Sequence, residues 1–150
     1  LYADRGRGEH FGATSRPSAT LRSHEHTMSI RPVLADDRIA PRAAEKISAF
    51  HADTLEQVRG AVERHDVVVV GMAQNPHVRR VRQALSEARV AFEYVEVGSY
   101  LSGWRRRLAI KLWSGWPTFP QVFVRGTLLG GDSLTRAALA DGSLQERLSA

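Results

Sequence analysis

The sequence predicts an α/β fold of three layers, in which a four-stranded mixed sheet is flanked by helices. Three observations carry this prediction. The run Val67–Val70 is β-branched throughout, as in a strand that is buried on both faces. A helical segment separates this run from a second strand-like run, which predicts a parallel pair joined by a crossover. Residues 121–130 then read as two short apolar runs around a Gly-containing turn, which predicts an antiparallel hairpin.

One helix is predicted before the first strand in the sequence, and a second helix after it. Residues 53–64 repeat apolar side chains at helical spacing, and Asp53 followed three residues later by Glu56 resembles a capping box. The pair Asn75–Pro76 predicts the start of the second helix, because Asn accepts hydrogen bonds from the first amides and Pro suits the first helical position. This second helix is expected to end near Ala88.

The second half of the chain continues the alternation of strands and helices. Residues 90–97 predict a second strand, parallel to the first. Residues 102–113 predict the next helix. In that helix we expect Arg105, Arg106 and Arg107 on the exposed side, and Leu108, Leu112 and Trp113 toward the core. A final helix is predicted from Asp132 or Ser133 to Ala140.

Length and composition suit one domain with an extension. The chain has 150 residues, 43% of them hydrophobic. We expect residues 53–150 to form the domain and residues 1–52 to be a disordered or irregular extension. Leu1 is not a start residue, and an initiator at Met28 would make residues 1–27 a leader or an expression remnant. No apolar run is long enough to span a bilayer and no signal-peptide pattern is present, so we expect a cytoplasmic protein without membrane contact.

Two counts restrict the function. The formal net charge is +5, and residues 61–150 hold 12 basic and 8 acidic side chains, a balance compatible with an anionic ligand. The arginines are not interleaved with exposed aromatic residues, so nucleic acid is not an expected partner. The chain has no cysteine, which excludes disulfides, thiolate metal sites and catalysis by a thiol of its own.

The segment Trp116-Pro117-Thr118-Phe119-Pro120 predicts a ledge for a ligand at the start of the hairpin. An X–Pro bond costs only about 0.5 to 1 kcal/mol to be cis. A cis bond between Phe119 and Pro120 would turn the Phe119 amide and carbonyl outward, where they could pair with an extended peptide.

This segment, the apolar strand that follows it and the pair Gly130-Gly131 resemble the C-terminal half of a glutaredoxin, and the match is closest to the monothiol class. The resemblance covers about residues 53–148 and implies a thioredoxin-like fold with a cis-proline. It places the nucleophilic cysteine of the family on Asn75 and the usual active-site lysine on Met72. The two residues on which thiol chemistry depends in the family are therefore absent from the N-terminal half of the matching region.

We expect no catalytic residue in the segment Asn75-Pro76-His77-Val78. An asparagine amide cannot form the thiolate that mixed-disulfide chemistry requires. It also cannot ligate a [2Fe–2S] cluster as the family does, so neither a cluster nor another metal site is expected. Asn75 reads instead as a helix cap. His77 is the one remaining candidate for acid–base work, and the alternative is a solvated histidine in a first helical turn.

The resemblance also implies a groove for glutathione. In the family, the cysteinyl backbone of glutathione pairs with the residue before the cis-proline. Its glycine carboxylate meets basic residues of a helix, and its γ-glutamyl end meets the amides after Gly-Gly. The corresponding residues here are Arg107, Lys111, Thr118, Phe119, Pro120, Gly131, Asp132 and Ser133. Arg107 and Lys111 read equally well as a solvated helix face, and the Asp132 side chain would compete with an incoming carboxylate.

Three functions remain open. The first is a redox-inactive module that binds glutathione or an extended peptide. The second is a protein-interaction or adaptor module linked to iron–sulfur or redox homeostasis, with an acidic partner for the basic side chains. The third is a glutathione-assisted oxidoreductase in which the ligand supplies the thiol. The basic set Arg79, Arg80, Arg82 and Arg89 is expected to form a solvated face, with an acidic partner as the alternative.

Overall fold

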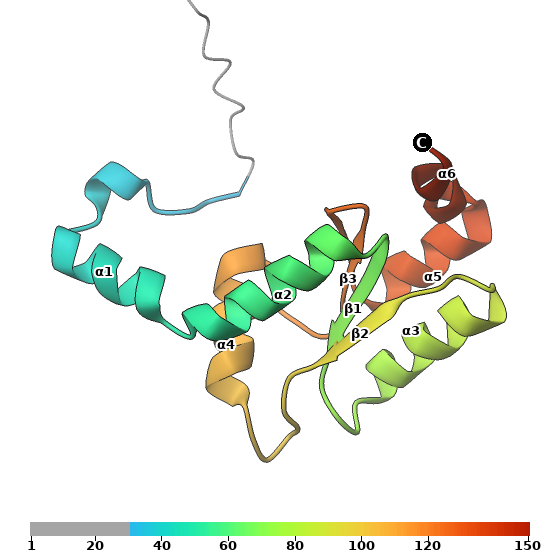
Figure 1. Ribbon diagram of the computed structural model, residues 1–150, viewed down its shortest axis with the longest axis horizontal. Helices are drawn as coiled ribbons and strands as arrows, with labels where there is room; N and C mark the ends of the chain where they lie inside the picture. The colour runs from blue at the N-terminus through green and yellow to red at the C-terminus, as the bar shows by residue number, and fades with distance from the viewer. Residues whose placement is uncertain (1–30) are drawn as a thin grey trace, which may run out of the picture. The chain divides into compact units, whose positions relative to one another are not determined.

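The computed structural model describes residues 31–150, of which Val33–Ala150 form one compact unit (Figure 1). The predictions made for residues 1–27 lie outside the described part. In chain order the elements are a 3-10 turn (Asp36–Arg38), α1 (Pro41–Ala49), α2 (Ala52–Arg64), β1 (Val67–Gly71), α3 (Pro76–Glu87), β2 (Glu93–Glu96), α4 (Trp104–Ser114), β3 (Gln121–Val124), β4 (Thr127–Gly130), α5 (Asp132–Asp141) and α6 (Ser143–Ser149).

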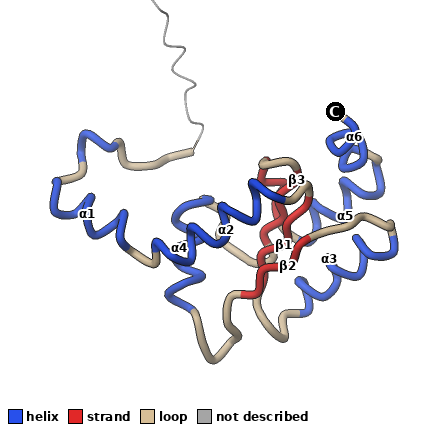
Figure 2. The backbone as a smooth tube through the Cα atoms, viewed as in Figure 1, coloured by secondary structure: helices blue, strands red, loops and turns tan. Residues whose placement is uncertain are grey.

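The four strands form one mixed sheet in the order β2-β1-β3-β4. Figure 2 shows the strands in red, with helices around them. β1 pairs in parallel with β2 and antiparallel with β3, and β3 pairs antiparallel with β4. The hairpin turn uses Arg125 at φ 47° and Gly126 at φ 79°, the positive dihedrals that a tight two-residue connection requires. The predicted mixed sheet and hairpin are confirmed.

Alternate side chains of β1 enter two separate cores. Val68 and Val70 pack with α2 and α4 on one face of the sheet, and Val67 and Val69 pack with α3, α5 and α6 on the other. All four valines are at most 1% exposed. A strand whose two faces are both covered needs apolar side chains at every position, which explains the unbroken run in the sequence.

The start of α2 differs from the prediction. The helix begins at Ala52, and its N-cap residue is His51, which has a left-handed backbone and makes no side-chain capping bond. Asp53 therefore lies inside the helix, and the predicted capping box is wrong. Thr54 is buried instead, and its hydroxyl accepts a hydrogen bond of 2.9 Å from Nε of Arg106, which ties α2 to α4.

The buried face of α4 is rotated from the predicted one. Ala109 and Ile110 are at most 2% exposed, whereas Leu108 is 37% and Leu112 is 69% exposed. The placement of both leucines in the core is therefore wrong. Trp113 packs as predicted, with its ring centroid 5.8 Å from that of Phe123. The third buried side chain of α4 is that of Arg107, described below.

The chain does not end its regular structure at Ala140. α5 extends to Asp141, Gly142 adopts a left-handed conformation, and α6 follows directly. Leu144 of α6 is fully buried in the core against β1 and β3. No helix within residues 31–150 is both long and apolar enough to cross a membrane.

Candidate ligand-binding groove

The segment before β3 has the backbone that its prolines predict. α4 ends at Ser114, and its C-cap residue Gly115 takes a left-handed conformation at φ 75°. The Phe119–Pro120 peptide bond is cis, as predicted. Phe119 is only 8% exposed and anchors the segment in the core. The side-chain amide of Gln121 donates a hydrogen bond of 3.1 Å to the carbonyl of Trp116. This bond ties the first residue of β3 to the start of the loop.

Packing against Trp116 explains the pair Gly130-Gly131. A Cβ atom on Gly130 would lie 2.6 Å from Leu134 and 3.3 Å from the indole, at a φ of 127° that favours glycine. A Cβ atom on Gly131 would lie 3.3 Å from the indole nitrogen and 3.4 Å from the carbonyl oxygen of Pro120. The two glycines and Trp116 thus bring the start of α5 beside the cis-proline segment.

A groove of about 690 Å³ runs between the start of α3, the inner side of α4, the cis-proline segment and the start of α5. It is lined by all eight residues that the resemblance assigned to a ligand: Arg107, Lys111, Thr118, Phe119, Pro120, Gly131, Asp132 and Ser133. Asn75 and His77 also line it. The fold therefore collects the predicted site residues, which come from separate parts of the sequence, along one surface.

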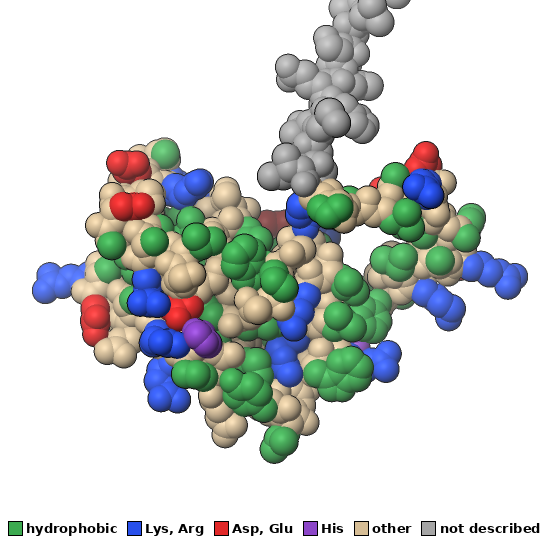
Figure 3. Space-filling view, turned by 180° about the vertical axis from the view of Figure 1, so that it is seen from behind, with side chains coloured by type: hydrophobic (Ala, Val, Ile, Leu, Met, Phe, Trp, Pro, Cys, Tyr) green, Lys and Arg blue, Asp and Glu red, His purple; other side chains and the backbone are tan. Residues whose placement is uncertain are grey.

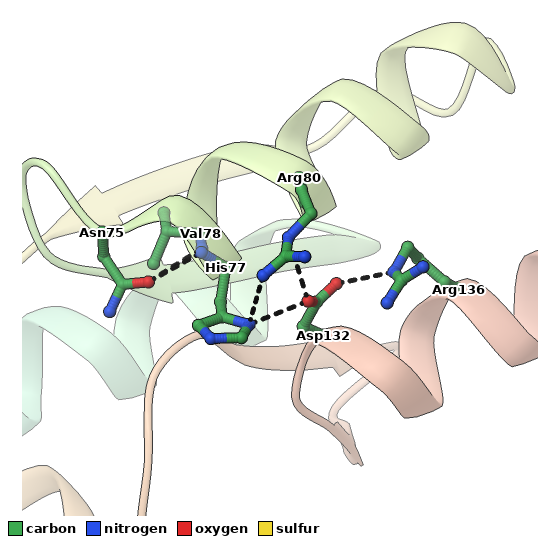
Figure 4. A network of polar contacts seen from close by, with 6 residues as sticks. All are labelled: Asn75, His77, Val78, Arg80, Asp132 and Arg136. Atoms are coloured by element: carbon green, nitrogen blue, oxygen red, sulfur yellow. Dashed lines mark hydrogen bonds and ion pairs between the residues drawn. The ribbon is translucent and has the colours of Figure 1, made fainter.

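Asn75 caps α3 as predicted. Its side-chain oxygen accepts hydrogen bonds from the backbone amides of His77 at 2.9 Å and Val78 at 3.2 Å (Figure 4). These are two of the amides that a helix leaves without a partner in its first turn. The Asn75 side chain is thus committed to local structure.

Replacing Asn75 with alanine is expected to destabilise the fold by about 1 kcal/mol, because the two amides lose their acceptor. Replacing it with serine keeps an oxygen at the cap and should cost less than half as much. Urea unfolding followed by circular dichroism would compare the two variants with the unaltered chain. Equal stability of all three would contradict the capping role.

Asp132 holds together a cluster that joins α3 to α5 (Figure 4). Its Oδ1 accepts a hydrogen bond of 2.8 Å from Nε of Arg136, and its Oδ2 lies 3.0 Å from Nδ1 of His77 and 3.5 Å from Nε of Arg80. The carboxylate is thus directed across to α3 rather than toward the amides at the start of its own helix. Asp132 therefore leaves those amides open to another acceptor.

The charged neighbours keep Asp132 ionised. Partial burial by itself would raise the pKa of this carboxyl group, but hydrogen bonds from His77 and Arg136, with the charges of Arg136 and Arg80, outweigh that effect and lower the pKa below its usual range. An ionised carboxylate can only accept hydrogen bonds. It therefore favours the tautomer of His77 that carries a proton on Nδ1, which leaves Nε2 as the unprotonated nitrogen.

The same His77 nitrogen also lies 3.0 Å from a terminal nitrogen of Arg80. A guanidinium can only donate, so Nδ1 cannot satisfy both neighbours at once. Donation to the carboxylate is the stronger arrangement, because an ionised acceptor makes a stronger bond than a neutral one. Arg80 keeps its ion pair with Asp132 in either case.

Arg107 is buried, which contradicts its prediction as an exposed side chain. It is only 8% exposed, and its Nη1 donates hydrogen bonds of 2.9 Å to the carbonyl of Val97 and 2.7 Å to that of Ser102. Burial lowers the pKa of its guanidinium. The residue holds the loop from β2 to α4 in place, and only its remaining donors are available to the groove.

The groove is basic. Four cationic side chains line it, those of Arg80, Arg107, Lys111 and Arg136. The lining contains one carboxylate, that of Asp132. Figure 3 shows the molecule from behind, with basic side chains gathered beside a histidine. The ammonium group of Lys111 lies 5.8 Å from the ring centroid of Phe119, at the predicted ligand ledge. This lining favours a ligand with carboxylate groups.

Sequence reasoning missed part of this groove. The sequence predicts a solvated face for Arg80 and no site role for Arg136 or Tyr100, whereas all three line the groove. The contact between His77 and Asp132 joins residues 55 positions apart, and no local pattern signals it. The separate arginines of Figure 4 are brought together only by the packing of α3 against α5.

Comparison with known proteins assigns the fold to a family. A family profile described as Glutaredoxin matches residues 67–129. A glutaredoxin-like protein of Dictyostelium discoideum is 48% identical over 71% of this chain and 90% of its own length. The chloroplastic monothiol glutaredoxin-S14 of Arabidopsis thaliana is 29% identical over 89% of this chain and 78% of its own.

A solved structure leads to the same assignment. The solution structure of reduced apo GrxS14 from poplar is 31% identical and superimposes with a TM-score of 0.53, over 69% of this chain and 94% of that one. With its thioredoxin-like sheet, cis-proline and Gly-Gly pair, and without a cysteine, this chain belongs to the glutaredoxin family.

Proposed function

We propose that this protein binds glutathione, or an extended peptide of similar charge, without forming a covalent bond to it. The observation that carries the proposal is the single basic groove that holds all eight expected contact residues. Because the chain has no cysteine, it cannot form the mixed disulfide of a thiol-based glutaredoxin, and we propose that it is redox-inactive through its own side chains.

Three features support glutathione as the ligand. Phe119 lines the groove beside the cis-proline, where an extended cysteinyl residue would pair. The ammonium group of Lys111 is close to the same place and suits the glycine carboxylate. At the other end of the groove, the side chain of Asp132 is engaged by α3, so the amides at the start of α5 can receive the γ-glutamyl carboxylate.

Titration of the full chain with reduced glutathione, followed by two-dimensional NMR, tests the proposal. Saturable shifts are expected for the amides of Phe119, Gly131, Asp132 and Ser133. An α-linked Glu-Cys-Gly tripeptide separates the two ligand classes, because it retains the cysteinyl backbone but changes the γ-glutamyl end. No saturable shift with either ligand at millimolar concentration would refute the proposal.

Replacing Lys111 with glutamate is expected to weaken glutathione binding about tenfold or more, because a charge-assisted bond to the ligand carboxylate is replaced by repulsion. The measurement is the dissociation constant from the same titration. Arg79→Glu is the matched control, since it makes the same change in net charge at an exposed position of α3 outside the groove. Equal weakening in both variants would indicate a general charge effect instead of a contact.

One observation favours the second function in its general form, a protein-interaction module. A hollow of about 560 Å³ between α1, α2 and α4 is lined mainly by apolar side chains. Ile47, Leu108 and Leu112 in this hollow are 61%, 37% and 69% exposed. Copurification of a partner that is lost in Leu112→Asp but retained in Lys111→Glu would favour this function over ligand binding. The cytoplasmic location stays a prediction.

A further inference from the structure

We infer that His77 accepts the proton of the glutathione thiol, so that the groove holds its ligand as a thiolate. This inference rests on the proposed function, because the thiol belongs to the ligand and the chain has none. It assigns to the segment Asn75-Pro76-His77-Val78 a chemical role that differs from that of a protein cysteine.

The first argument is the position of His77. Its side chain is 55% exposed and lines the groove together with Asn75 and Phe119. The resemblance places the cysteinyl backbone of the ligand on Phe119 and the family's own sulfur on Asn75. The ligand sulfur is thus expected between these two residues, in the groove that His77 also lines.

The second argument is the orientation of the ring. The 3.0 Å contact between Nδ1 and Oδ2 of Asp132 fixes the ring by the edge that faces α5 (Figure 4). Because the carboxylate is ionised and can only accept, Nδ1 carries the proton, and in the neutral imidazole Nε2 then has a free lone pair. A histidine whose Nδ1 is held by a carboxylate is well arranged to accept a proton at Nε2. Asp132 acts here as a positioning residue.

The third argument is the charge around the product of the transfer. Arg80 from α3, Arg136 from α5, and Arg107 and Lys111 from α4 line the groove, with Tyr100 as the other titratable side chain. Asp132 is the one acidic side chain in that lining, and it faces the imidazole. The cations therefore favour the thiolate.

The step is a proton transfer. The S–H bond of the ligand breaks, its electron pair stays on sulfur, and the proton forms a bond with Nε2 of His77. A neutral thiol and a neutral imidazole become a thiolate and an imidazolium, and no electron is exchanged. The thiolate is the nucleophilic form of the ligand, whereas the thiol is not.

The test uses the full chain saturated with reduced glutathione, and it follows thiolate absorption in the ultraviolet as a function of pH. Since the chain has no cysteine, the thiolate signal comes from the ligand alone. A parallel titration with S-methylglutathione subtracts tyrosine ionisation. The thiol of a free cysteine side chain has a pKa of about 8.5, and we expect the midpoint for bound glutathione to lie at least about one unit below that of free glutathione.

The variant His77→Gln distinguishes the effect of the imidazole on the ligand thiol from the effect of the basic side chains that line the groove. It should still bind glutathione, with the NMR shifts described above, but its titration midpoint should move back toward that of the free ligand by about one unit, a tenfold loss of thiolate. Asp132→Asn keeps the imidazole, loses the ionised partner and should shift the midpoint part of the way. Arg82→Gln, which removes an exposed cation outside the groove, should leave the midpoint unchanged.

Two results would overturn the inference while the proposed function stands: glutathione bound with the midpoint of the free ligand, or a lowered midpoint that His77→Gln leaves unchanged. The second result would assign the thiolate to the basic lining alone. A chain whose NMR spectrum does not respond to glutathione would overturn the proposed function and this inference with it.

Discussion

Replacing Leu144 with alanine is expected to lower the free energy of unfolding by about 2 to 5 kcal/mol, one of the largest effects of any single truncation in this chain. The Leu144 side chain is fully buried and joins α6 to the core formed by β1 and β3. Alanine leaves a cavity there and loses the transfer free energy of the removed methyl and methylene groups. Urea unfolding at equilibrium measures the loss.

Leu112→Ala is the control for this experiment. The chemical change is the same, but Leu112 is 69% exposed on α4, so the expected change is within about 0.5 kcal/mol. The comparison also tests two corrections to the predicted core, the rotated face of α4 and the added helix α6. If Leu112→Ala cost as much as Leu144→Ala, the buried face of α4 would be the one that the sequence predicted.

Replacing Arg107 with methionine is expected to destabilise the fold by about 2 to 4 kcal/mol, because the carbonyls of Val97 and Ser102 lose a charged donor. Methionine keeps most of the apolar stem and fills the space, so the loss isolates the hydrogen bonds. The loop from β2 to α4, which includes Tyr100 at the edge of the groove, should become more mobile. Thermal unfolding and amide hydrogen exchange measure the two effects.

Arg105→Met provides the matched control on the same helix. Arg105 is exposed, and its nearest aromatic contacts are 5.7 Å from ring centroids, so its replacement should change stability by less than about 0.5 kcal/mol. A similar small effect for Arg107→Met would show that the two carbonyls are satisfied without the guanidinium. The Arg107 side chain would then be available to a ligand.

The parts of the fold that were predictable from sequence are those specified by local chemistry. Val67–Val70 predicts a strand buried on both faces, and Asn75–Pro76 predicts the start of α3, because each depends on neighbouring residues only. The segment ending at Pro120 and the pair Gly130-Gly131 predicted the groove through the resemblance, and the packing of Trp116 on both glycines explains why the two occur together.

The errors concern contacts between distant parts of the chain. The side chain of Arg107 reads as solvated because arginine is usually exposed, and only the position of the β2–α4 loop supplies the carbonyls that bury it. α6 has seven residues, too few for a periodic pattern, so its one buried leucine gave little signal. The cluster around Asp132 depends on the packing of α3 against α5, which no local pattern encodes.

Asn75 serves as a helix cap and cannot act as a nucleophile. Under the proposed function, this changes what controls the occupancy of the groove by its ligand. A glutaredoxin with a nucleophilic cysteine exchanges electrons with its ligand, so its state follows the ratio of thiol to disulfide in its surroundings. An amide cannot be oxidised in that exchange. Occupancy of the groove would then follow simple mass action, half-filled when the free ligand equals its dissociation constant, and it would return to empty on dilution without any reductant.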